Sequence, residues 1–283
     1  MVKLSSLGDG ADYNTAGMIL EGKKILVTGV LTPASIAFAI ADLAQREGAD
    51  IVLTSFGRAM SLTEKSARRM NPAPEVLEMD VNDQAQVDEL AETLRKRWGR
   101  LDGFVHAIAF APGDALGGNF MTAPWESVQT AFRTSTYSLK AMAQSLAPLM
   151  REHGGSIVTL DFDNSTQAWP IYDWMGVCKA ALESVTRYLA RDLGRYQIRV
   201  NALAAGPLET MAAKGIPGFE QISETWAGRS PLGWDKRDRA PVAKMACVLL
   251  SDWASATTGE IVHVDGGYHA MGAELVKETP PPD

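Results

Sequence analysis

Several features are scarce in this sequence, and each scarcity excludes a class of protein. Only two cysteines occur among 283 residues, Cys178 and Cys247, and they have the spacing of neither a metal site nor a disulfide framework. We therefore predict no metal site and reduced thiols, as in the cytoplasm. A basic excess is also missing, since the formal net charge is −7. Proteins that bind nucleic acids carry a basic face, so no nucleic-acid partner is expected.

Long apolar runs are missing as well. The longest apolar stretch, residues 25–44, is interrupted by Gly29, Pro33 and Asp42, so no membrane insertion is predicted. The first 17 residues contain no apolar run of the kind that a secretory signal needs. We interpret residues 1–19 as a flexible leader and residues 271–283 as a flexible, proline-rich tail.

Between these ends, strand-like and helix-like patterns alternate. Short apolar runs predict strands at 24–29, 50–56, 75–80, 102–109, 155–162, 198–205 and 260–266. Helical patterns lie between them, at 35–48, 82–99, 124–150, from about 172 to 193, and 240–252. Several strands are apolar on both faces, as buried parallel strands are. The sequence therefore predicts an α/β fold: a single Rossmann-like doubly wound domain over residues 20–270, with a seven-stranded parallel sheet and helices on both faces.

Ligands of such folds bind beyond the carboxyl ends of the strands, so those ends are the places to look for chemistry. After the first strand only Gly29 remains of the GxGxxG dinucleotide fingerprint, and glycine is also the usual turn residue. Ser35 lies at the start of the next helix. There its hydroxyl could help the backbone amides to hold a pyrophosphate, or it could simply cap the helix.

The second and third strand ends leave alternatives open. The second ends in "SFGR", with no acid to bind a ribose and with one arginine, Arg58. Phe56 could cover an adenine ring or close the sheet edge, so these residues alone do not decide between NADH and NADPH. The third ends at Asp80 and Val81, where a carboxylate could meet the adenine amino group or cap the next helix.

Tyr172 and Lys179 form the most informative pair. They are seven residues apart, about two helical turns, so on one helix they face the same way. Lys179 lies in the small, apolar segment "GVCKAALES", which favours a functional lysine over a solvated one. Tyr172 follows Pro170 and is expected just ahead of the helix, pointing into a cleft.

The segments "VTGV", "LDGFVHAIAF", Tyr-x6-Lys and "VNALAAGPLET" resemble the short-chain dehydrogenase/reductase superfamily, and in particular its enoyl-acyl carrier protein reductase branch. "YDWMGVCKAALESVTRYLARDLG" and "ATTGEIVHVDGGYHA" are most similar to actinobacterial members. The resemblance covers residues 20–270. It implies reduction of the 2,3 double bond of trans-2-enoyl thioesters, on acyl carrier protein or CoA, with NADH in type II fatty acid synthesis. A homotetramer is also implied.

The resemblance further assigns roles to residues. Lys179 would hold the nicotinamide ribose, Tyr172 would donate to the developing enolate oxygen, and Phe162 would pack at the nicotinamide and substrate. Substrate contacts are implied for Tyr172, Met175 and Phe162. Cofactor contacts are implied for Gly29, Ser35, Ile36, Phe56, Asp80, Val81, Ile108, Ala109, Asp161, Lys179, Gly206, Leu208 and Thr210. Ala107 and Ala109 replace a serine and a glycine of the mycobacterial enzymes.

The superfamily spacing separates this site from that of a carbonyl reductase. With Lys179 as the reference, Met175 and Phe162 stand near the positions where a carbonyl reductase needs two hydroxyl groups. Tyr172 lies further out, which suits the thioester oxygen of a conjugated substrate. A ketone or alcohol dehydrogenase and a non-catalytic NAD-binding regulator are the alternatives.

Residues 209–228 are an apolar but interrupted segment. Two interpretations are open: a mobile lid over an acyl chain, or ordinary helices packed on the sheet. Gly215, Pro217 and Gly218 interrupt the segment, so one continuous helix is not expected. By the resemblance, the segment at 209–234 covers the acyl groove and is shorter than in the mycobacterial long-chain enzymes, so we expect no preference for very long chains.

Overall fold

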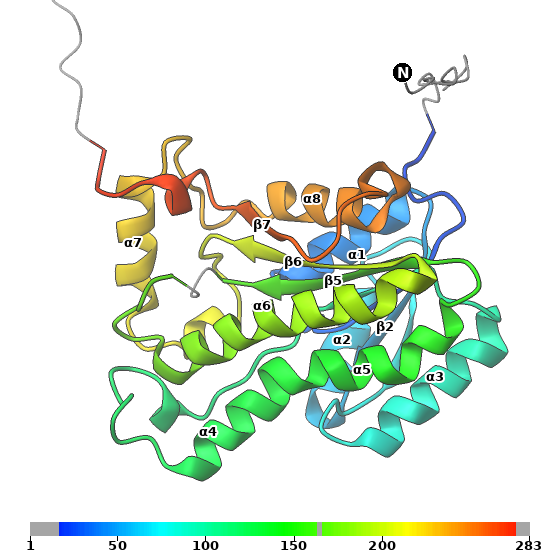
Figure 1. Cartoon of the computed structure of the whole chain (residues 1–283), viewed down its shortest axis with the longest axis horizontal. Helices are drawn as coiled ribbons and strands as arrows, with labels where there is room; N and C mark the ends of the chain where they lie inside the picture. The colour runs from blue at the N-terminus through cyan, green and yellow to red at the C-terminus, as the bar shows by residue number, and fades with distance from the viewer. Residues whose placement is uncertain (1–16, 163–165, 276–283) are drawn as a thin grey trace, which may run out of the picture.

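The computed structural model describes residues 17–162 and 166–275. Its strands form one parallel sheet in the order β3-β2-β1-β4-β5-β6-β7 (Figure 1). The strands are β1 (Lys24–Val27), β2 (Asp50–Ser55), β3 (Glu75–Glu78), β4 (Gly103–His106), β5 (Gly155–Asp161), β6 (Ile198–Ala205) and β7 (Ile261–Val264). The seven-stranded parallel sheet predicted from the sequence is confirmed.

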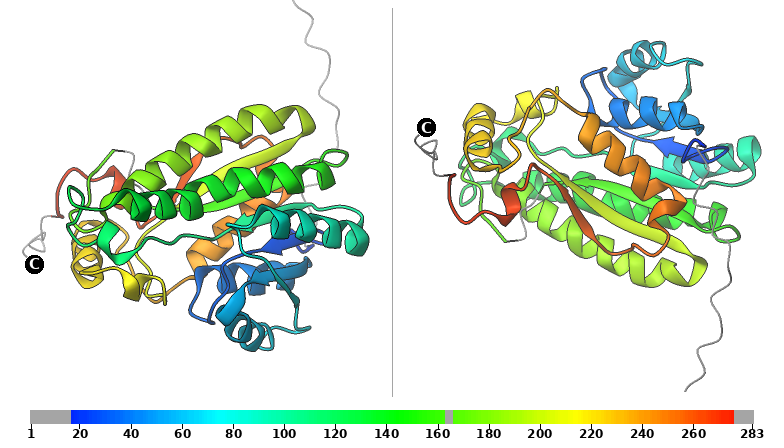
Figure 2. Two further views of the ribbon diagram at one scale, coloured as in Figure 1. Left: turned by 90° about the horizontal axis from the view of Figure 1, so that it is seen from below. Right: turned by 90° about the horizontal axis from the view of Figure 1, so that it is seen from above.

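Helices cover both faces of this sheet (Figure 2). On one face α1 and α8 pack in a shared core with the sheet, and on the other α3, α5 and α6 do so. The helices are α1 (Ile36–Arg46), α2 (Met60–Ala67), α3 (Gln84–Trp98), α4 (Trp125–Phe132), α5 (Ser138–Leu146), α6 (Asp173–Leu193), α7 (Phe219–Arg229) and α8 (Ala240–Leu250). This arrangement confirms the doubly wound fold.

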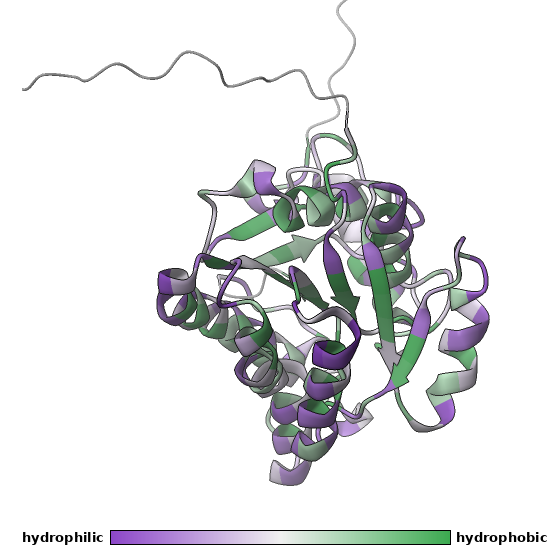
Figure 3. Cartoon of the chain, turned by 90° about the vertical axis from the view of Figure 1, so that its right-hand side faces the viewer, coloured by the Kyte–Doolittle hydropathy of each residue, from purple (hydrophilic) through white to green (hydrophobic). Residues whose placement is uncertain are grey.

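Apolar strands form the centre of the molecule. Figure 3 shows hydrophobic strands between helices whose hydrophilic residues face outward. Strand β4 is buried at every position, as expected for a central strand covered on both faces. The strand order reverses between β1 and β4, so the crevice for a ligand lies beyond the carboxyl ends of these two strands.

One predicted helix is interrupted. The pattern over 124–150 forms α4 and α5 with a π-helical turn, Arg133–Tyr137, between them. Polar side chains of this turn bond to neighbouring segments: Ser135 Oγ donates to the Phe110 carbonyl, and Thr136 Oγ1 donates to the Cys178 carbonyl. Such turns commonly mark functional sites, and this one lies against the end of β4 and against α6. Helix α2 was not expected from the sequence.

The predicted leader and tail lie mostly outside the described residues. Their described parts bond to the rest of the molecule. The Ile19 amide donates to Glu47 Oε2 at 3.2 Å, and the Leu275 amide donates to the Gly228 carbonyl at 3.2 Å. Among the described residues, no helix has both the length and the apolar character that crossing a membrane requires.

Candidate active site

The turn after β1 needs glycine for steric reasons. Gly29 has φ +79°, and a Cβ there would stand 2.0 Å from the Ala107 carbonyl oxygen. Thr28 Oγ1 donates to the Val105 carbonyl and accepts from the Ala107 amide, which joins the ends of β1 and β4. The two strand ends at the reversal point are thus held in direct contact.

Ser35 occupies the N-cap position of α1 without capping it. Its Oγ instead accepts hydrogen bonds from the Leu31 and Thr32 amides, at 3.1 and 3.0 Å, and so closes the preceding loop. The capping interpretation of its side chain is wrong. The first amides of α1, beginning with Ile36, have no side-chain cap, and a helix N-terminus of this kind suits a pyrophosphate.

The ends of β2 and β3 carry the predicted adenine contacts. Phe56 follows β2 directly, and its side chain is 50% exposed. Asp80 does not cap α3, because Asp83 does so by accepting from the Ala85 amide at 3.0 Å. The helix-cap alternative for Asp80 is therefore wrong. Its Oδ1 accepts from Asn82, and Val81 beside it is buried.

Tyr172 stands immediately before α6, as expected, and is 9% exposed. The neighbouring backbone is held by the loop at 117–119. The Gly117 amide donates to the Ile171 carbonyl, and Asp173 Oδ2 accepts from the Gly118 and Asn119 amides at 2.6 and 2.9 Å. Asp173 has φ +42°, an unusual conformation that these bonds help to maintain.

Lys179 lies on the buried side of α6, and its ammonium donates to the Leu160 carbonyl at 2.7 Å. Burial lowers the pKa of Lys179, and the carboxylate of Asp161 opposes that shift. Asp161 also acts on Tyr172: burial first, and then this carboxylate, raise the pKa of the phenol well above its usual value. The structure therefore brings Asp161, Tyr172 and Lys179 into one electrostatic group.

Phe162 and Met175 complete the wall around Tyr172. The Phe162 ring meets the Tyr172 ring edge-on at a centroid distance of 5.1 Å, and Met175 is buried in the same cluster. Phe162 also contacts Trp169 and Trp226, at 5.4 and 5.2 Å. The side chains packed around Tyr172 are thus apolar or aromatic. Within this cluster, Tyr172 carries the hydroxyl group.

The remaining predicted cofactor residues lie at the ends of β4 and β6. Ile108 and Ala109 follow β4, and the backbone of the next residue is bonded to Ser135 of the π-helical turn. Gly206 follows β6 in close contact with Trp234 and Trp226, where a Cβ would stand 2.6 and 2.9 Å from their rings. Beyond it, Leu208 is buried and Thr210 Oγ1 accepts from the Ala213 amide.

These features fit a dinucleotide. The switch-point turn at Gly29 leads to an α1 N-terminus without a side-chain cap, and an exposed Phe56 lies at the end of β2. Lys179 has three ammonium hydrogens, and the Leu160 carbonyl accepts one of them. Within the described part of the chain, no group of His, Cys, Asp and Glu side chains could hold a metal ion.

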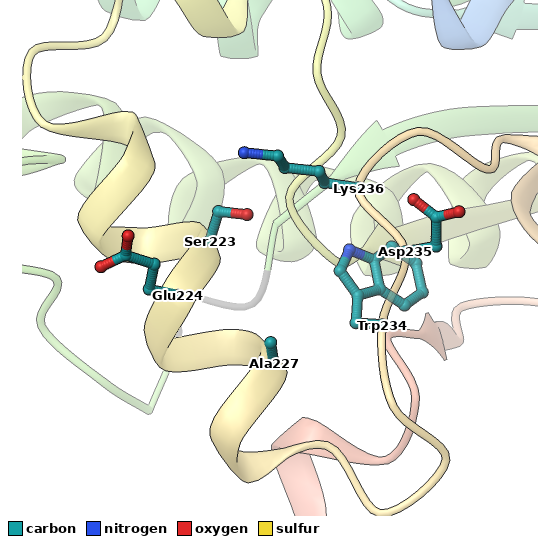
Figure 4. A pocket seen from close by; sticks show the side chains of 6 residues that line it. All are labelled: Ser223, Glu224, Ala227, Trp234, Asp235 and Lys236. Carbon is teal, nitrogen blue, oxygen red and sulfur yellow. The ribbon is translucent and has the colours of Figure 1, made fainter.

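A separate surface pocket lies beside α7. It has a volume of 380 Å³ and is lined by Ser223, Glu224, Ala227, Trp234, Asp235 and Lys236 (Figure 4). Neither Tyr172 nor Lys179 lines it. The space beside Tyr172 is instead filled by aromatic rings, so this pocket and the chemical groups do not coincide.

Sequence reasoning missed two residues that shape this site, Trp169 and Asp173. Trp169 packs among the rings at Phe162, and Asp173 holds the loop at 117–119 against the start of α6. A tryptophan three residues before Tyr172 was visible in the sequence, but its neighbours were not. The positive φ of Asp173 depends on contacts 55 residues away in the chain, so it has no local signal.

Comparisons with known proteins show the family of this chain. Residues 29–269 match the family described as enoyl-(acyl carrier protein) reductase. The chain is 44% identical over 263 residues to an enoyl-[acyl-carrier-protein] reductase [NADH] of Mycolicibacterium smegmatis, covering 88% of this chain and 97% of that protein. It is 43% identical over 262 residues to the protein of the same name from Mycobacterium avium, covering 88% and 97%.

A more distant relative agrees. The enoyl-[acyl-carrier-protein] reductase [NADH] FabI of Aquifex aeolicus is 39% identical over 266 residues, which is 92% of this chain and 98% of that protein. Together with a parallel sheet whose order reverses at Gly29 and a buried Tyr172–Lys179 pair, these matches identify the family. The chain belongs to the enoyl-acyl carrier protein reductase family.

Proposed function

We propose that the protein reduces the 2,3 double bond of trans-2-enoyl thioesters with NADH, as a step of type II fatty acid synthesis. The observation that carries this proposal is the buried Tyr172 two helical turns from the buried Lys179, with Met175 and Phe162 packed around it. Side chains that could polarise a ketone at the Met175 and Phe162 positions are absent. The outlying tyrosine suits the thioester oxygen, which lies three bonds from the β-carbon that accepts hydride.

Tyr172 acts as a hydrogen-bond donor. Its raised pKa keeps the phenol protonated near neutral pH. The hydroxyl can therefore donate a hydrogen bond, but it does not serve as a base. Negative charge collects on the thioester oxygen when the double bond is reduced. A positioned O–H aimed at that oxygen stabilises the transition state more than the ground state.

Lys179 holds the cofactor. The ammonium hydrogens that do not bond Leu160 are available to the nicotinamide ribose hydroxyls, and the carboxylate of Asp161 favours the charged lysine. When bound, NADH supplies the hydride. Phe162 packs against Tyr172 and keeps water from the reacting carbons.

The absence of an acid at the end of β2 bears on cofactor choice. Ser55 ends this strand, and Phe56 presents an exposed ring to the adenine side. Arg58 stands alone in the following short helix, without a basic cluster to hold a 2′-phosphate. This arrangement supports NADH, which is also the reductant named for the relatives.

The carrier, the assembly and the location complete the proposal. Acyl carrier protein is the carrier named for the relatives, and we extend the proposal to CoA thioesters. A homotetramer is supported by apolar side chains exposed along and near α4: Phe120, Met121, Trp125, Phe132 and Tyr137. The two free cysteines suit the reducing cytoplasm.

The test is spectrophotometric. Purified protein with NADH should lose the reduced-nicotinamide absorbance when a trans-2-enoyl thioester is added, and should leave a panel of simple ketones unreduced. Turnover of ketones with inert enoyl thioesters would instead identify a ketone reductase. Tight NADH binding with no turnover of either class would identify a non-catalytic binder.

A further inference from the structure

Five aromatic rings fill the space between the start of α6 and α7. Trp169 lies at the centre of this ring cluster, with its centroid 5.4 Å from Phe162, 5.4 Å from Trp226 and 5.6 Å from Tyr268. Phe162 in turn contacts Tyr172. Trp169 therefore joins the apolar group around the catalytic tyrosine to the group beneath α7.

Two of these rings are fixed by polar bonds. Trp226 stacks on Tyr268 at 3.8 Å, and its indole nitrogen donates to the Asp265 carbonyl at 2.9 Å. Tyr268 is held by Arg229, which donates to its hydroxyl at 3.1 Å and lies over its ring. These contacts fasten α7 to the segment after β7.

The side chain of Trp169 is held by packing contacts, whereas its carbonyl accepts from the Tyr172 amide at 3.1 Å. Its indole nitrogen is buried and has no hydrogen-bond acceptor among the described residues. Residues 166–169 belong to neither a helix nor a strand. A buried N–H without an acceptor is costly. Displacement of the Trp169 indole therefore breaks no side-chain hydrogen bond among the described residues, whereas displacement of Trp226 or Tyr268 does.

An acyl chain bound for reduction must enter this ring cluster. When the thioester oxygen bonds Tyr172, the chain extends from the double bond into the nearest apolar volume. The apolar side chains packed with Tyr172 include Phe162, Met175 and Ile216, and Trp169 packs in the same cluster. A short acyl chain needs only a small displacement of the Trp169 indole. Each further methylene group requires a larger displacement.

We infer that Trp169 is the residue that sets acyl chain length, by closing the far end of the acyl site and limiting good substrates to short and medium chains. This inference rests on the proposed enoyl reduction. It assigns the limit to one side chain instead of to the length of the segment at 209–228.

The experiment compares kcat/KM for four-, eight-, twelve- and sixteen-carbon trans-2-enoyl-CoA with NADH. The parent should use the sixteen-carbon substrate at least about tenfold less well than the eight-carbon one, since apolar pockets discriminate by factors of this order. Trp169→Ala should raise the sixteen-to-eight ratio by about tenfold or more. Trp169→Phe keeps a ring without the N–H and should retain most of the parent's limit.

Trp253→Ala is the matched control, because Trp253 is 74% exposed and lies in the short helix Asp252–Ala254. It should leave the chain-length profile unchanged. NADH binding and thermal unfolding of each variant show that it is folded, and Trp169→Leu, which also removes the indole, serves as the test if Trp169→Ala is not folded. Equal loss at every chain length, or an unchanged sixteen-to-eight ratio, in the folded variant without the indole would overturn the inference. Absence of turnover by the parent with every thioester would refute the proposed function instead.

Discussion

At the residue scale, burial disfavours the charged form of both central groups: it raises the pKa of Tyr172 and lowers the pKa of Lys179. Tyr172 and Lys179 are both buried, and both respond to the charge of Asp161. We propose two separate tasks for these groups: the Tyr172 phenol donates to the substrate, and Lys179, which bonds a main-chain carbonyl, retains the cofactor. Single substitutions at the two residues should therefore differ in effect, one on turnover and the other on NADH affinity.

Tyr172→Phe should bind NADH nearly as tightly as the parent and turn over more slowly. The expected loss in kcat is about tenfold to a thousandfold, the range for removing one oxyanion donor. Tyr188→Phe is a matched control on the same helix, because Tyr188 is 60% exposed. Steady-state kinetics and NADH titration measure the two effects; unchanged kcat in Tyr172→Phe would remove the tyrosine from the mechanism.

Lys179→Ala should lose most of the affinity for NADH, because the ammonium bonds the cofactor before any chemistry occurs. Lys244→Ala, an exposed lysine on α8, controls for the loss of one charge. Fluorescence titration with NADH gives both dissociation constants. If Lys179→Ala bound NADH like the parent, the lysine would be no more than a structural partner of the Leu160 carbonyl.

At the scale of elements, we propose that the loop after β2 determines cofactor choice. Phe56 is exposed and Arg58 is the nearest cation in its short helix, so a 2′-phosphate would meet a single, solvated partner. We expect kcat/KM to favour NADH strongly over NADPH. Equal or better values with NADPH would show that Arg58 captures the phosphate.

The segment at 209–228 has two unequal parts. Its α7 end is fixed by Trp226, which is 1% exposed, whereas Met211 at the other end is 48% exposed. Gly218, with φ +75°, precedes α7 and touches Ile171, the residue before Tyr172. We propose that residues 210–218 are the moving part of the lid and that Gly218 is its hinge.

Hydrogen exchange tests this proposal. Without ligand, residues 209–228 should be the least protected part of the core fold, and within them 210–218 should exchange faster than 222–228. NADH together with an acyl ligand should raise their protection. Protection equal to that of β5 in the free protein would identify the segment as a static wall.

At the scale of the whole molecule, a buried histidine links stability to pH. His106 contacts Thr159 Oγ1 and Ser138 Oγ, at 2.9 and 2.8 Å. Ser138 donates its own proton to the Thr134 carbonyl, so it accepts from His106 Nε2. Burial, followed by the charge of Lys179, lowers the pKa of His106 to about 3. The histidine is therefore neutral in the folded protein at neutral pH.

Because the unfolded chain binds this proton near pH 6.5 and the folded chain does not, falling pH favours unfolding. The contribution is complete above about pH 6.5 and is lost progressively toward pH 3. His106→Gln should be less stable at pH 7.5 but should lose less free energy of unfolding between pH 7.5 and 4.5. Urea titrations at both pH values measure this, with exposed His153→Gln as control; parallel losses in parent and His106→Gln would contradict it.

The sequence by itself determined the fold and which side chains are candidates for the site. Seven apolar runs alternating with helical patterns led to the parallel sheet, because buried strands and amphipathic helices have distinct periods. The spacing of Tyr172 and Lys179 predicted one helical face for the same local reason. Met175 and Phe162 were visible as side chains without hydroxyl groups.

Only the tertiary structure decided which hydrogen bonds are made by side chains that could either cap a helix or bond elsewhere. Ser35 closes a loop instead of capping α1, and Asp83, not Asp80, caps α3, because the choice depends on which amides come within reach. The unusual φ of Asp173 and the place of Trp169 among the aromatic rings depend on contacts between segments distant in sequence. Such contacts leave no periodic pattern along the chain, since they are specified by packing after the elements have come together.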